Sequence, residues 1–327
     1  MLRVPFDELH GILRDALQPT GMAAGRADRC ARLFAEASRD GVASHGLNRF
    51  PRFLRTIARG VVDVNATAAP AATHGALERW DGRRGPGNLN AHDAMQRAIA
   101  LAREHGIGCV AMANTNHWMR GGSYGWQAAD AGLVGICWTN TLPNLPPWGA
   151  CDPRVGNNPL VVAVPRAAGH VVLDMAMSQF SVGGLASYKA RGEALPVAGG
   201  YDPSGALSHD PAAIELSGRL LPIGFWKGSG LALVLDLVAA LVSGGHATHE
   251  VSSDPELETG LSQVFIAIDP GGTNGGLADR VIAHLHAGSG EVRYPGERTL
   301  AARIRNMREG VPVDPAIWQD VQARAAG

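Results

Sequence analysis

Short apolar runs alternate with stretches of helical spacing through the middle of the chain, and this alternation constrains the fold more than any other feature. The runs that have the length and composition of strands lie at residues 108–113, 134–140, 160–164, 171–175 and 263–268. The helical stretches among them lie at residues 91–105, 123–131 and 228–242. Strands that are apolar along their whole length are buried on both faces. The pattern therefore predicts an α/β fold whose sheet is covered by helices on both sides.

Both ends of the chain are expected to be helical. Amphipathic stretches lie at residues 6–17, 26–40, 48–59, 298–309 and 315–326. Residues 61–75 are rich in Ala, Pro and Thr and are interpreted as an irregular connection. We divide the chain into a helical domain, residues 1–75 plus 295–327, and an α/β cofactor- and substrate-binding core, residues 76–294.

Composition narrows the class of protein. A formal net charge of -1 gives no reason to expect a nucleic-acid or membrane partner. The four cysteines are widely spaced and form no metal-ligand pattern, which favours free thiols in a reducing compartment and no metal site. The first residues lack the apolar region of a signal peptide. The longest apolar run, residues 231–242, is too short to span a bilayer and is interpreted as a buried helix. We therefore expect a cytoplasmic protein.

Residues 44–49, with the sequence SHGLNR, place an imidazole and a guanidinium four residues apart. If this segment is helical, the two side chains lie on one face, with Cβ atoms about 5–6 Å apart. A 2-oxo acid has its ketone carbon bonded directly to its carboxylate, so its proton donor and its carboxylate-binding group must lie side by side. His45 can supply the proton, and Arg49 can bind the carboxylate with two parallel hydrogen bonds. A surface histidine followed by a surface arginine is the alternative that the spacing leaves open.

Two loops are further candidates for a ligand site. The stretch NHWMRGGSYG at residues 116–125 lies between a predicted strand and a predicted helix, where α/β proteins bind ligands. A structural turn with His117 packed on Trp118 explains it equally well. Thr139 precedes a proline-rich loop at residues 143–147 that could form a rigid pocket wall or a plain crossover.

Two other positions carry charge where it needs an explanation. Asp174 lies within an apolar strand, where a carboxylate is costly unless it is paired. It could orient an imidazole or cap a turn or helix at the end of the strand.

Residues 225–230 (FWKGSG) open the apolar helix, and a helix start with glycines and Lys227 is either an anion site or an ordinary glycine-rich start. No G-x-G-x-x-G, P-loop, H-E-x-x-H or G-x-S-x-G motif occurs.

Taken together, these clusters resemble one known family over residues 2–320: the second, non-Rossmann type of malate and L-lactate dehydrogenase. The matching elements are SHG at 44–46, NH at 116–117, RVGNNP at 154–159, LDMA at 173–176, KG at 227–228 and PGE at 295–297. The subgroup that reduces 2,3-diketo-L-gulonate is the most similar. Its long stretches stand here at residues 116–129, 135–140, 146–150 and 226–230.

The resemblance implies a role for each candidate residue. His45 matches the catalytic proton donor of the family, and Asp174 matches the acid that pairs with it. The positions that match substrate-binding residues are Ser44, Arg49, His117 and Thr139. The positions that match cofactor-binding residues are Val172, Leu173, Asp174, Met175, Ala176, Trp226, Lys227, Gly296, Glu297 and Arg298.

The resemblance also implies a non-Rossmann NAD(P)-binding fold with a mixed central sheet, and a homodimer with its active sites near the subunit contact. The implied reaction is hydride transfer from NADH, or from NADPH, to the ketone of a 2-oxo carboxylate such as the sugar acid 2,3-diketo-L-gulonate. Two alternatives remain open within the family. One is the reduction of cyclic imino acids such as piperideine- or pyrroline-2-carboxylate, and the other is malate- or lactate-type 2-hydroxy acid oxidation. A non-catalytic sugar-acid or nucleotide binding protein is the alternative outside it.

Overall fold

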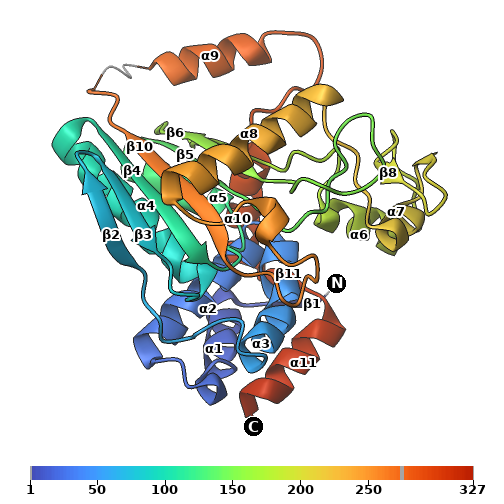
Figure 1. Ribbon diagram of the computed structural model, residues 1–327, viewed down its shortest axis with the longest axis horizontal. Helices are drawn as coiled ribbons and strands as arrows, with labels where there is room; N and C mark the ends of the chain where they lie inside the picture. Colours follow the sequence, from blue (N-terminus) through green and yellow to red (C-terminus); the bar gives the residue numbers. More distant parts are fainter. Residues whose placement is uncertain (1, 273–275, 327) are drawn as a thin grey trace.

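The computed structural model describes residues 2–272 and 276–326, and a seven-stranded mixed sheet lies at its centre (Figure 1). In pairing order its strands are β2 (Ala69–His74), β3 (Leu77–Asp81), β4 (Ile107–Thr115), β10 (Leu261–Ile268), β5 (Val134–Thr139), β6 (Leu160–Val164) and β7 (Val171–Met175). Only β3 and β4 pair in parallel, and the other neighbours are antiparallel. The prediction of an α/β fold with a mixed sheet is confirmed.

Helices cover both faces of this sheet, as the apolar strands predict. α4 (Gly87–His105) and α5 (Gly122–Asp130) pack on one face, against side chains such as Val110 and Phe265. α8 (Trp226–Ser243) packs on the other face, against their sequence neighbours Ala111 and Val264. Successive strand residues point to opposite faces, so each strand contributes to two cores.

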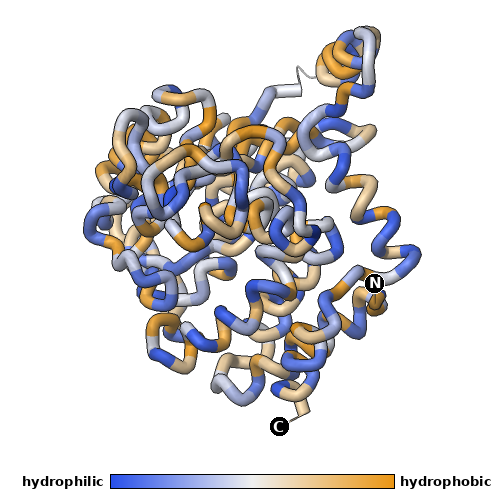
Figure 2. The backbone as a smooth tube through the Cα atoms, turned by 90° about the vertical axis from the view of Figure 1, so that its right-hand side faces the viewer, coloured by the Kyte–Doolittle hydropathy of each residue, from blue (hydrophilic) through white to orange (hydrophobic). Residues whose placement is uncertain are grey.

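The two ends of the chain share a third core. It joins α1 (Phe6–Asp15), α2 (Ala24–Arg39), α3 (Phe50–Ala58) and α11 (Pro315–Ala326). β1 (Leu2–Val4) pairs antiparallel with β11 (Val311–Val313), and α10 (Glu297–Glu309) leads into that strand. Figures 1 and 2 place both termini at this end of the molecule. The flanking helical part is therefore built from both chain ends, while the exact division at residues 75 and 295 stays a prediction.

One prediction about the first connection is wrong. Residues 61–75 are not irregular throughout, because Ala69–His74 form the edge strand β2. Pro70 lies within this strand, and a proline is tolerated on an edge strand because no ladder hydrogen bond is needed on its open side. The Ala, Pro and Thr composition gave no strand signal. β2 pairs with β3 because the turn at residues 75–76 joins the two strands directly.

A long excursion separates β7 from α8. It contains α6 (Val182–Arg191), the short pair β8 (Gly200–Tyr201) and β9 (Leu207–Ser208), and α7 (Pro211–Ser217). Leu185 and Ile214 from its two helices join the core on the α8 face. At the far end from the termini, α9 (Leu277–His286) lies beyond the sheet (Figures 1 and 2).

α8 is only half buried, which corrects the expectation of a buried helix. Its buried positions recur at helical spacing and include Ala232, Asp236 and Ala239. On the other side Leu237 is 48% exposed and Leu241 is 72% exposed. Among the helices that the structure describes, α8 alone has the length and apolar composition to cross a membrane.

Candidate active site

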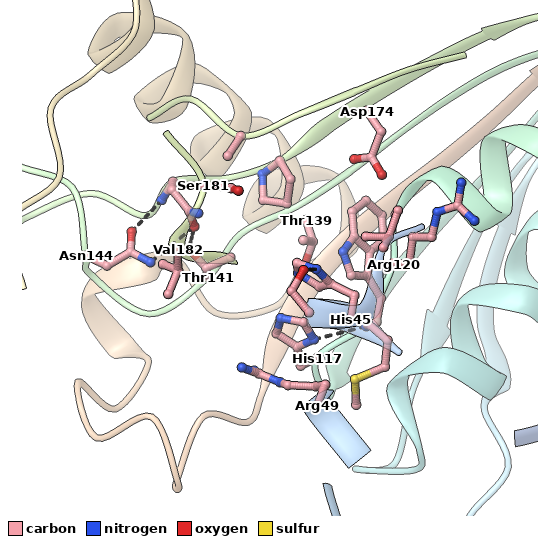
Figure 3. Close-up of a pocket in the computed structure, with 18 of the residues that line it drawn as sticks. His45, Arg49, His117, Arg120, Thr139, Thr141, Asn144, Asp174, Ser181 and Val182 are labelled. Atoms are coloured by element: carbon pink, nitrogen blue, oxygen red, sulfur yellow. Dashed lines mark hydrogen bonds between the residues drawn. The ribbon is translucent and has the colours of Figure 1, made fainter. Parts of the chain in front are cut away.

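A cavity of about 770 Å³ is lined by the helical part, the central sheet and the excursion around α6 and α7 (Figure 3). Its walls come from eight segments, which lie within residues 42–52, 117–126, 139–144, 157–159, 172–185, 214–220, 253–258 and 295–299. The volume lies within the range of about 300–1,000 Å³ that is typical of small-molecule sites. The cavity therefore brings together all three regions that the sequence singled out around His45, His117 and Asp174.

The segment that carries His45 and Arg49 is not the regular α-helix that the spacing argument assumed. It consists of two short 3₁₀ turns, Ala43–His45 and Leu47–Arg49, joined at Gly46. The α-helix expected over residues 48–59 begins at Phe50, with Pro51 in its first turn, where a missing N–H costs nothing. Both His45 and Arg49 nevertheless line the cavity.

Gly46 sets the position of this segment by its close approach to α2. A Cβ at Gly46 would lie 2.2 Å from Ser38 Oγ and 2.7 Å from Ser38 N. Leu47 N donates a hydrogen bond to that same Ser38 Oγ at 2.8 Å. The pair His45 and Arg49 is thus held against α2 through a contact that only glycine permits.

Gly46→Ala is expected to lower the free energy of unfolding by about 1–3 kcal/mol, because the added methyl group must displace backbone. The displacement also moves His45, so catalytic turnover is expected to fall with stability. Denaturant unfolding and a reductase assay measure the two effects. Gly25→Ala in α2 is the matched control, since no atom lies within 4 Å of the added Cβ. Equal behaviour of the two variants would contradict this role of Gly46.

His45 has one ring nitrogen engaged and one available. Its Nδ1 shares a hydrogen bond with Ser44 Oγ at 3.1 Å, and no described residue pairs with Nε2. The imidazole ring stacks on that of His117, with the ring centroids 6.0 Å apart. Burial, together with the charges of Arg49 and Arg120, lowers the pKa of His45 to about 4. The ring is therefore neutral at pH 7 in the ligand-free protein.

His117 is fixed in one tautomer. Met119 N donates to His117 Nδ1 at 3.0 Å, so the proton of the neutral ring is on Nε2. Burial is the largest cause that holds the pKa of His117 well below its usual value, and the charges of Arg49 and His45 add to it. His117 can donate a hydrogen bond from Nε2, but its Nδ1 faces a backbone N–H and cannot take up a second proton without losing that bond. His45 differs because its Nδ1 partner is a hydroxyl, which can accept as well as donate.

Arg49 presents its guanidinium to the cavity. Its contact among the described residues is with Glu258, at 3.8 Å between Nη2 and Oε2, too long for a hydrogen bond. Burial lowers the pKa of Arg49 to about 10, so the group is a cation at neutral pH. Its donors are thus available for a carboxylate. Thr139, buried at the end of β5, lines the same cavity and donates to Asn140 O.

Asp174 lines the cavity but is not hydrogen-bonded to His45. Its Oδ2 accepts from Gly122 N at 2.8 Å, at the first turn of α5, and no other hydrogen bond to it occurs among the described residues. Figure 3 shows the carboxylate apart from the His45 ring. Desolvation of the carboxylate by the surrounding protein raises the pKa of Asp174, whereas the charge of Arg120 and the hydrogen bond from Gly122 N lower it. The structure thus places Asp174 as the cap of a helix, the alternative that the sequence left open.

The predicted cofactor positions divide into two sets. Those that line the cavity are Val172, Leu173, Asp174, Ala176 and Gly296. Those outside it, within the part of the chain that the structure describes, are Met175, Trp226, Lys227, Glu297 and Arg298. Met175 packs toward the α8 core, Trp226 and Lys227 are exposed at the start of α8, and Glu297 and Arg298 begin α10.

Backbone contacts join the two groups of predicted cofactor positions that line the cavity, those at β7 and Gly296 before α10. Val172 N donates to Pro295 O at 2.9 Å. Gly296 has φ +98°, and a Cβ there would lie 3.0 Å from Val172 N. The start of β7 and the start of α10 therefore lie side by side and form one continuous part of the cavity wall.

Sequence reasoning missed four charged residues of the cavity: Arg52, Arg120, Glu258 and Glu215, the last of which pairs with Lys189. Arg120 lies in the glycine-rich loop that had been singled out, but no role was assigned to it. Arg52 follows Arg49 by three residues and could have been found by helical spacing. Glu258 lies in a polar loop with no local signal, and only the fold brings it to Arg49.

The chain belongs to the malate/L-lactate dehydrogenase family, whose model matches residues 4–322. It is therefore an oxidoreductase, the class that a histidine beside an arginine with available donors also favours. Among its relatives, the 2,3-diketo-L-gulonate reductase of Escherichia fergusonii is 44% identical over 332 residues, covering 98% of this chain and 100% of that protein.

Solved structures give the same assignment. The Δ1-piperideine-2-carboxylate reductase of Pseudomonas syringae superposes with a TM-score of 0.89 and 31% identity, covering 99% of this chain and 100% of that one. The sulfolactate dehydrogenase of Methanocaldococcus jannaschii superposes with a TM-score of 0.88 and 26% identity, covering 99% and 97%. The similarity in sequence is therefore greatest, among these three, to the enzyme that acts on a sugar acid.

Proposed function

We propose that this protein is a cytoplasmic reductase that transfers hydride from NADH to the ketone of a 2-oxo sugar acid, with 2,3-diketo-L-gulonate as its substrate. The observation that carries the proposal is the cavity in which His45 Nε2 and the donors of Arg49 are both unengaged by described residues. Membership of a dehydrogenase family supports a nicotinamide cofactor. The free state of all four cysteines is consistent with a reducing compartment.

Each polar residue of the cavity has a separate role in the proposed reaction. Arg49 binds the substrate carboxylate, which fixes the direction of the adjacent ketone. His45 donates its Nε2 proton to the oxygen as negative charge develops there. His117 Nε2–H adds a hydrogen bond without losing its proton, and Thr139 completes the polar wall. A bound nicotinamide supplies the hydride, and the residues that would hold it are Val172 to Asp174, Ala176 and Gly296. Asp174 acts through Gly122, by fixing the start of α5, rather than through His45.

Substrate binding is expected to be coupled to proton uptake. His45 has a pKa of about 4 in the free protein because it is buried beside Arg49 and Arg120. A carboxylate bound to Arg49 compensates that positive charge and raises the pKa of His45, so a fraction of a proton, up to one, is taken up at pH 7. Calorimetric titration with a non-reducible 2-oxo acid analogue, oxamate, in buffers of different ionisation enthalpy measures this number. Zero uptake by the wild type, or equal uptake by His45→Asn, would contradict the coupling.

The substrate is tested by a panel assayed with NADH and with NADPH. We expect kcat/KM to be highest for 2,3-diketo-L-gulonate with NADH, and lower for Δ1-piperideine-2-carboxylate, oxaloacetate and pyruvate. A higher value for the cyclic imine would favour imino-acid reduction instead. Failure to reduce any member of the panel, together with no change of NADH fluorescence on titration with protein, would refute the reductase.

We also propose that the exposed face of α8 is covered by a second copy of this chain. The face is apolar at Leu233, Val234, Leu237 and Leu241, and such a patch is typical of an interface. The expected mass by light scattering is twice 34.2 kDa. Leu237→Asp combined with Leu241→Asp is expected to give monomers. Leu216→Asp on α7, a more exposed leucine outside the patch, is the control and should leave the mass unchanged.

A further inference from the structure

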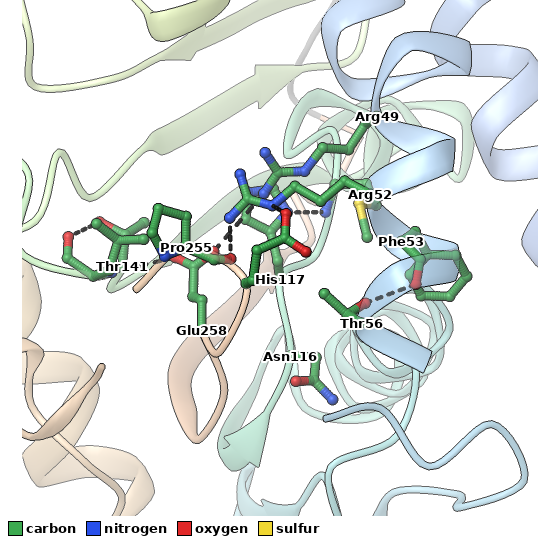
Figure 4. Close-up of polar contacts among 12 residues, drawn as sticks. Arg49, Arg52, Phe53, Thr56, Asn116, His117, Thr141, Pro255 and Glu258 are labelled. Atoms are coloured by element: carbon green, nitrogen blue, oxygen red, sulfur yellow. Dashed lines mark hydrogen bonds and ion pairs between the residues drawn. The ribbon is translucent and has the colours of Figure 1, made fainter. Parts of the chain in front are cut away.

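The end of the cavity beside α3 carries two charged groups that the proposed hydride transfer does not use. Arg52 lies on the first turn of α3, three residues after Arg49, and its side chain is 22% exposed. Glu258 reaches the same end from the loop between α8 and β10, and its side chain is 6% exposed. Both line the main cavity and also a small chamber behind it. Figure 4 shows the guanidinium groups of Arg49 and Arg52 side by side, with Glu258 near them.

Each of the two groups keeps hydrogen-bonding capacity. Arg52 donates from Nη2 to Pro255 O, and its Nε lies 3.8 Å from Glu256 Oε1, which leaves Nη1 without a partner among the described residues. Glu258 Oε1 accepts from Leu142 N at 3.2 Å, whereas Oε2 has only the long contact with Arg49. The cavity therefore ends in a donor-only guanidinium beside an acceptor-only carboxylate.

A hydroxyl group suits such a pair, because it accepts one hydrogen bond and donates another. A second carboxylate would suit it poorly, since Glu258 would repel it. A methyl group would leave both charges unpaired. Arg49 directly precedes α3 and Arg52 lies in its first turn. Residues at this helical spacing have Cβ atoms about 5–6 Å apart, so the next carbons of a chain held by its carboxylate at Arg49 can come within reach of Arg52.

We propose that Arg52 and Glu258 form a subsite for the hydroxyl groups of the substrate chain, and that this subsite selects hydroxylated 2-oxo acids over short and dicarboxylic ones. The inference rests on the proposed reductase function and specifies which residues bind the end of the substrate that is farthest from its carboxylate. Arg52 is thus a specificity-determining residue, distinct from the carboxylate-binding Arg49.

The test compares three substrates with NADH: 2,3-diketo-L-gulonate, 2-oxobutanoate and 2-oxoglutarate. Arg52→Met is expected to raise KM for 2,3-diketo-L-gulonate about 10- to 100-fold, the effect of losing a charge-assisted hydrogen bond, with kcat nearly unchanged. KM for 2-oxobutanoate, whose chain has no oxygen to contact Arg52, should change by less than about threefold. Glu258→Gln should improve kcat/KM for 2-oxoglutarate relative to 2,3-diketo-L-gulonate, because the repulsion of the second carboxylate is removed.

Arg55→Met is the control that distinguishes recognition of the substrate from stabilisation of the loop that carries Pro255 and Glu256. Arg55 binds Glu256 at 3.1 Å, as part of the same arginine cluster, but does not line the described cavity. Its loss should leave all three KM values within about threefold of the wild type. If Arg52→Met and Arg55→Met act alike, or if Arg52→Met raises KM equally for all substrates, the subsite is refuted. A wild type that reduces 2-oxobutanoate as efficiently as 2,3-diketo-L-gulonate would also refute the subsite but leave the reductase intact, whereas reduction of no 2-oxo acid would refute the reductase itself.

Discussion

Replacing His45 with Ala is expected to lower kcat for 2-oxo acid reduction by about 10²–10⁴-fold, the usual contribution of a positioned general acid. His45 has its Nε2 unengaged by described residues, whereas His117 has its Nδ1 occupied by Met119 N and a pKa that burial holds well below its usual value. His117→Gln should therefore act mainly on KM. Steady-state kinetics with NADH and 2,3-diketo-L-gulonate distinguish the two variants. Turnover by His45→Ala close to that of the wild type would refute His45 as the acid.

The same substitution has a consequence for stability that needs no substrate. The pKa of His45 is about 4 in the folded protein, below its ordinary value of 6.5, because of burial and the two arginines. Below pH 6.5 the unfolded chain binds a proton that the folded chain does not, so this residue destabilises the fold progressively as the pH falls from 6.5 to 4. The shift corresponds to at most about 3 kcal/mol. Urea unfolding at pH 7 and pH 4.5 should therefore show a smaller loss for His45→Ala than for the wild type.

The sequence predicted the local structure of the sheet but not its pairing. Each apolar run became a strand because a continuous apolar run of that length can be buried on both faces. The order could not be derived, since β10 enters between β4 and β5 from far along the chain, and that choice depends on non-local packing. The excursion with α6 and α7 gave no periodic signal, because β8 and β9 are two residues long and only Leu185 is buried in α6.

The candidate site could be predicted where its functional side chains lie close together along the chain. His45 and Arg49 could be paired because the same reaction needs both and they lie four residues apart. Glu258 could not be added, because only the fold brings its loop to Arg49. The partner of Asp174 could not be predicted for a related reason: a carboxylate in an apolar strand needs a partner, but the sequence does not say which one. The structure provides the amide of Gly122, from the next layer of the fold.

Asp40 is expected to be the most costly residue to remove for stability. Its carboxylate is 1% exposed at the end of α2 and is bound by three arginines from different parts of the chain. Arg39 Nε donates to Oδ1 at 2.8 Å, Arg120 Nη1 donates to Oδ2 at 2.5 Å, and Arg303 donates to both oxygens at 2.7–2.8 Å. Asp40→Ala leaves these cations without their shared partner. Breaking a buried ion pair from one side typically costs about 3–5 kcal/mol, and denaturant unfolding measures it.

The pH dependence distinguishes charge from packing in this cluster. Burial alone raises the pKa of Asp40, but the hydrogen bonds and charges of Arg303, Arg120 and Arg39 outweigh it and hold that pKa well below the usual range. The stabilisation is thus complete above about pH 4 and is lost as the pH falls below it, so the difference between wild type and Asp40→Ala should shrink in acid. Glu215→Gln removes a half-exposed pair with Lys189 and should cost less than about 1 kcal/mol. A similar loss for the two variants at pH 7 would contradict the role of Asp40.

Asp40 also connects stability to the chemistry of the site. Arg120, which is 5% exposed, lies between the carboxylate of Asp40 and the cavity and lowers the pKa of His45 by its charge. Without Asp40 the charge of Arg120 is no longer compensated, so the pKa of His45 is expected to fall further. Asp40→Asn, which keeps the side-chain shape, should then take up fewer protons on oxamate binding at pH 7 than the wild type. Unchanged uptake in a folded variant would mean that the cluster holds α2, the loop at residues 116–125 and α10 together without tuning the acid.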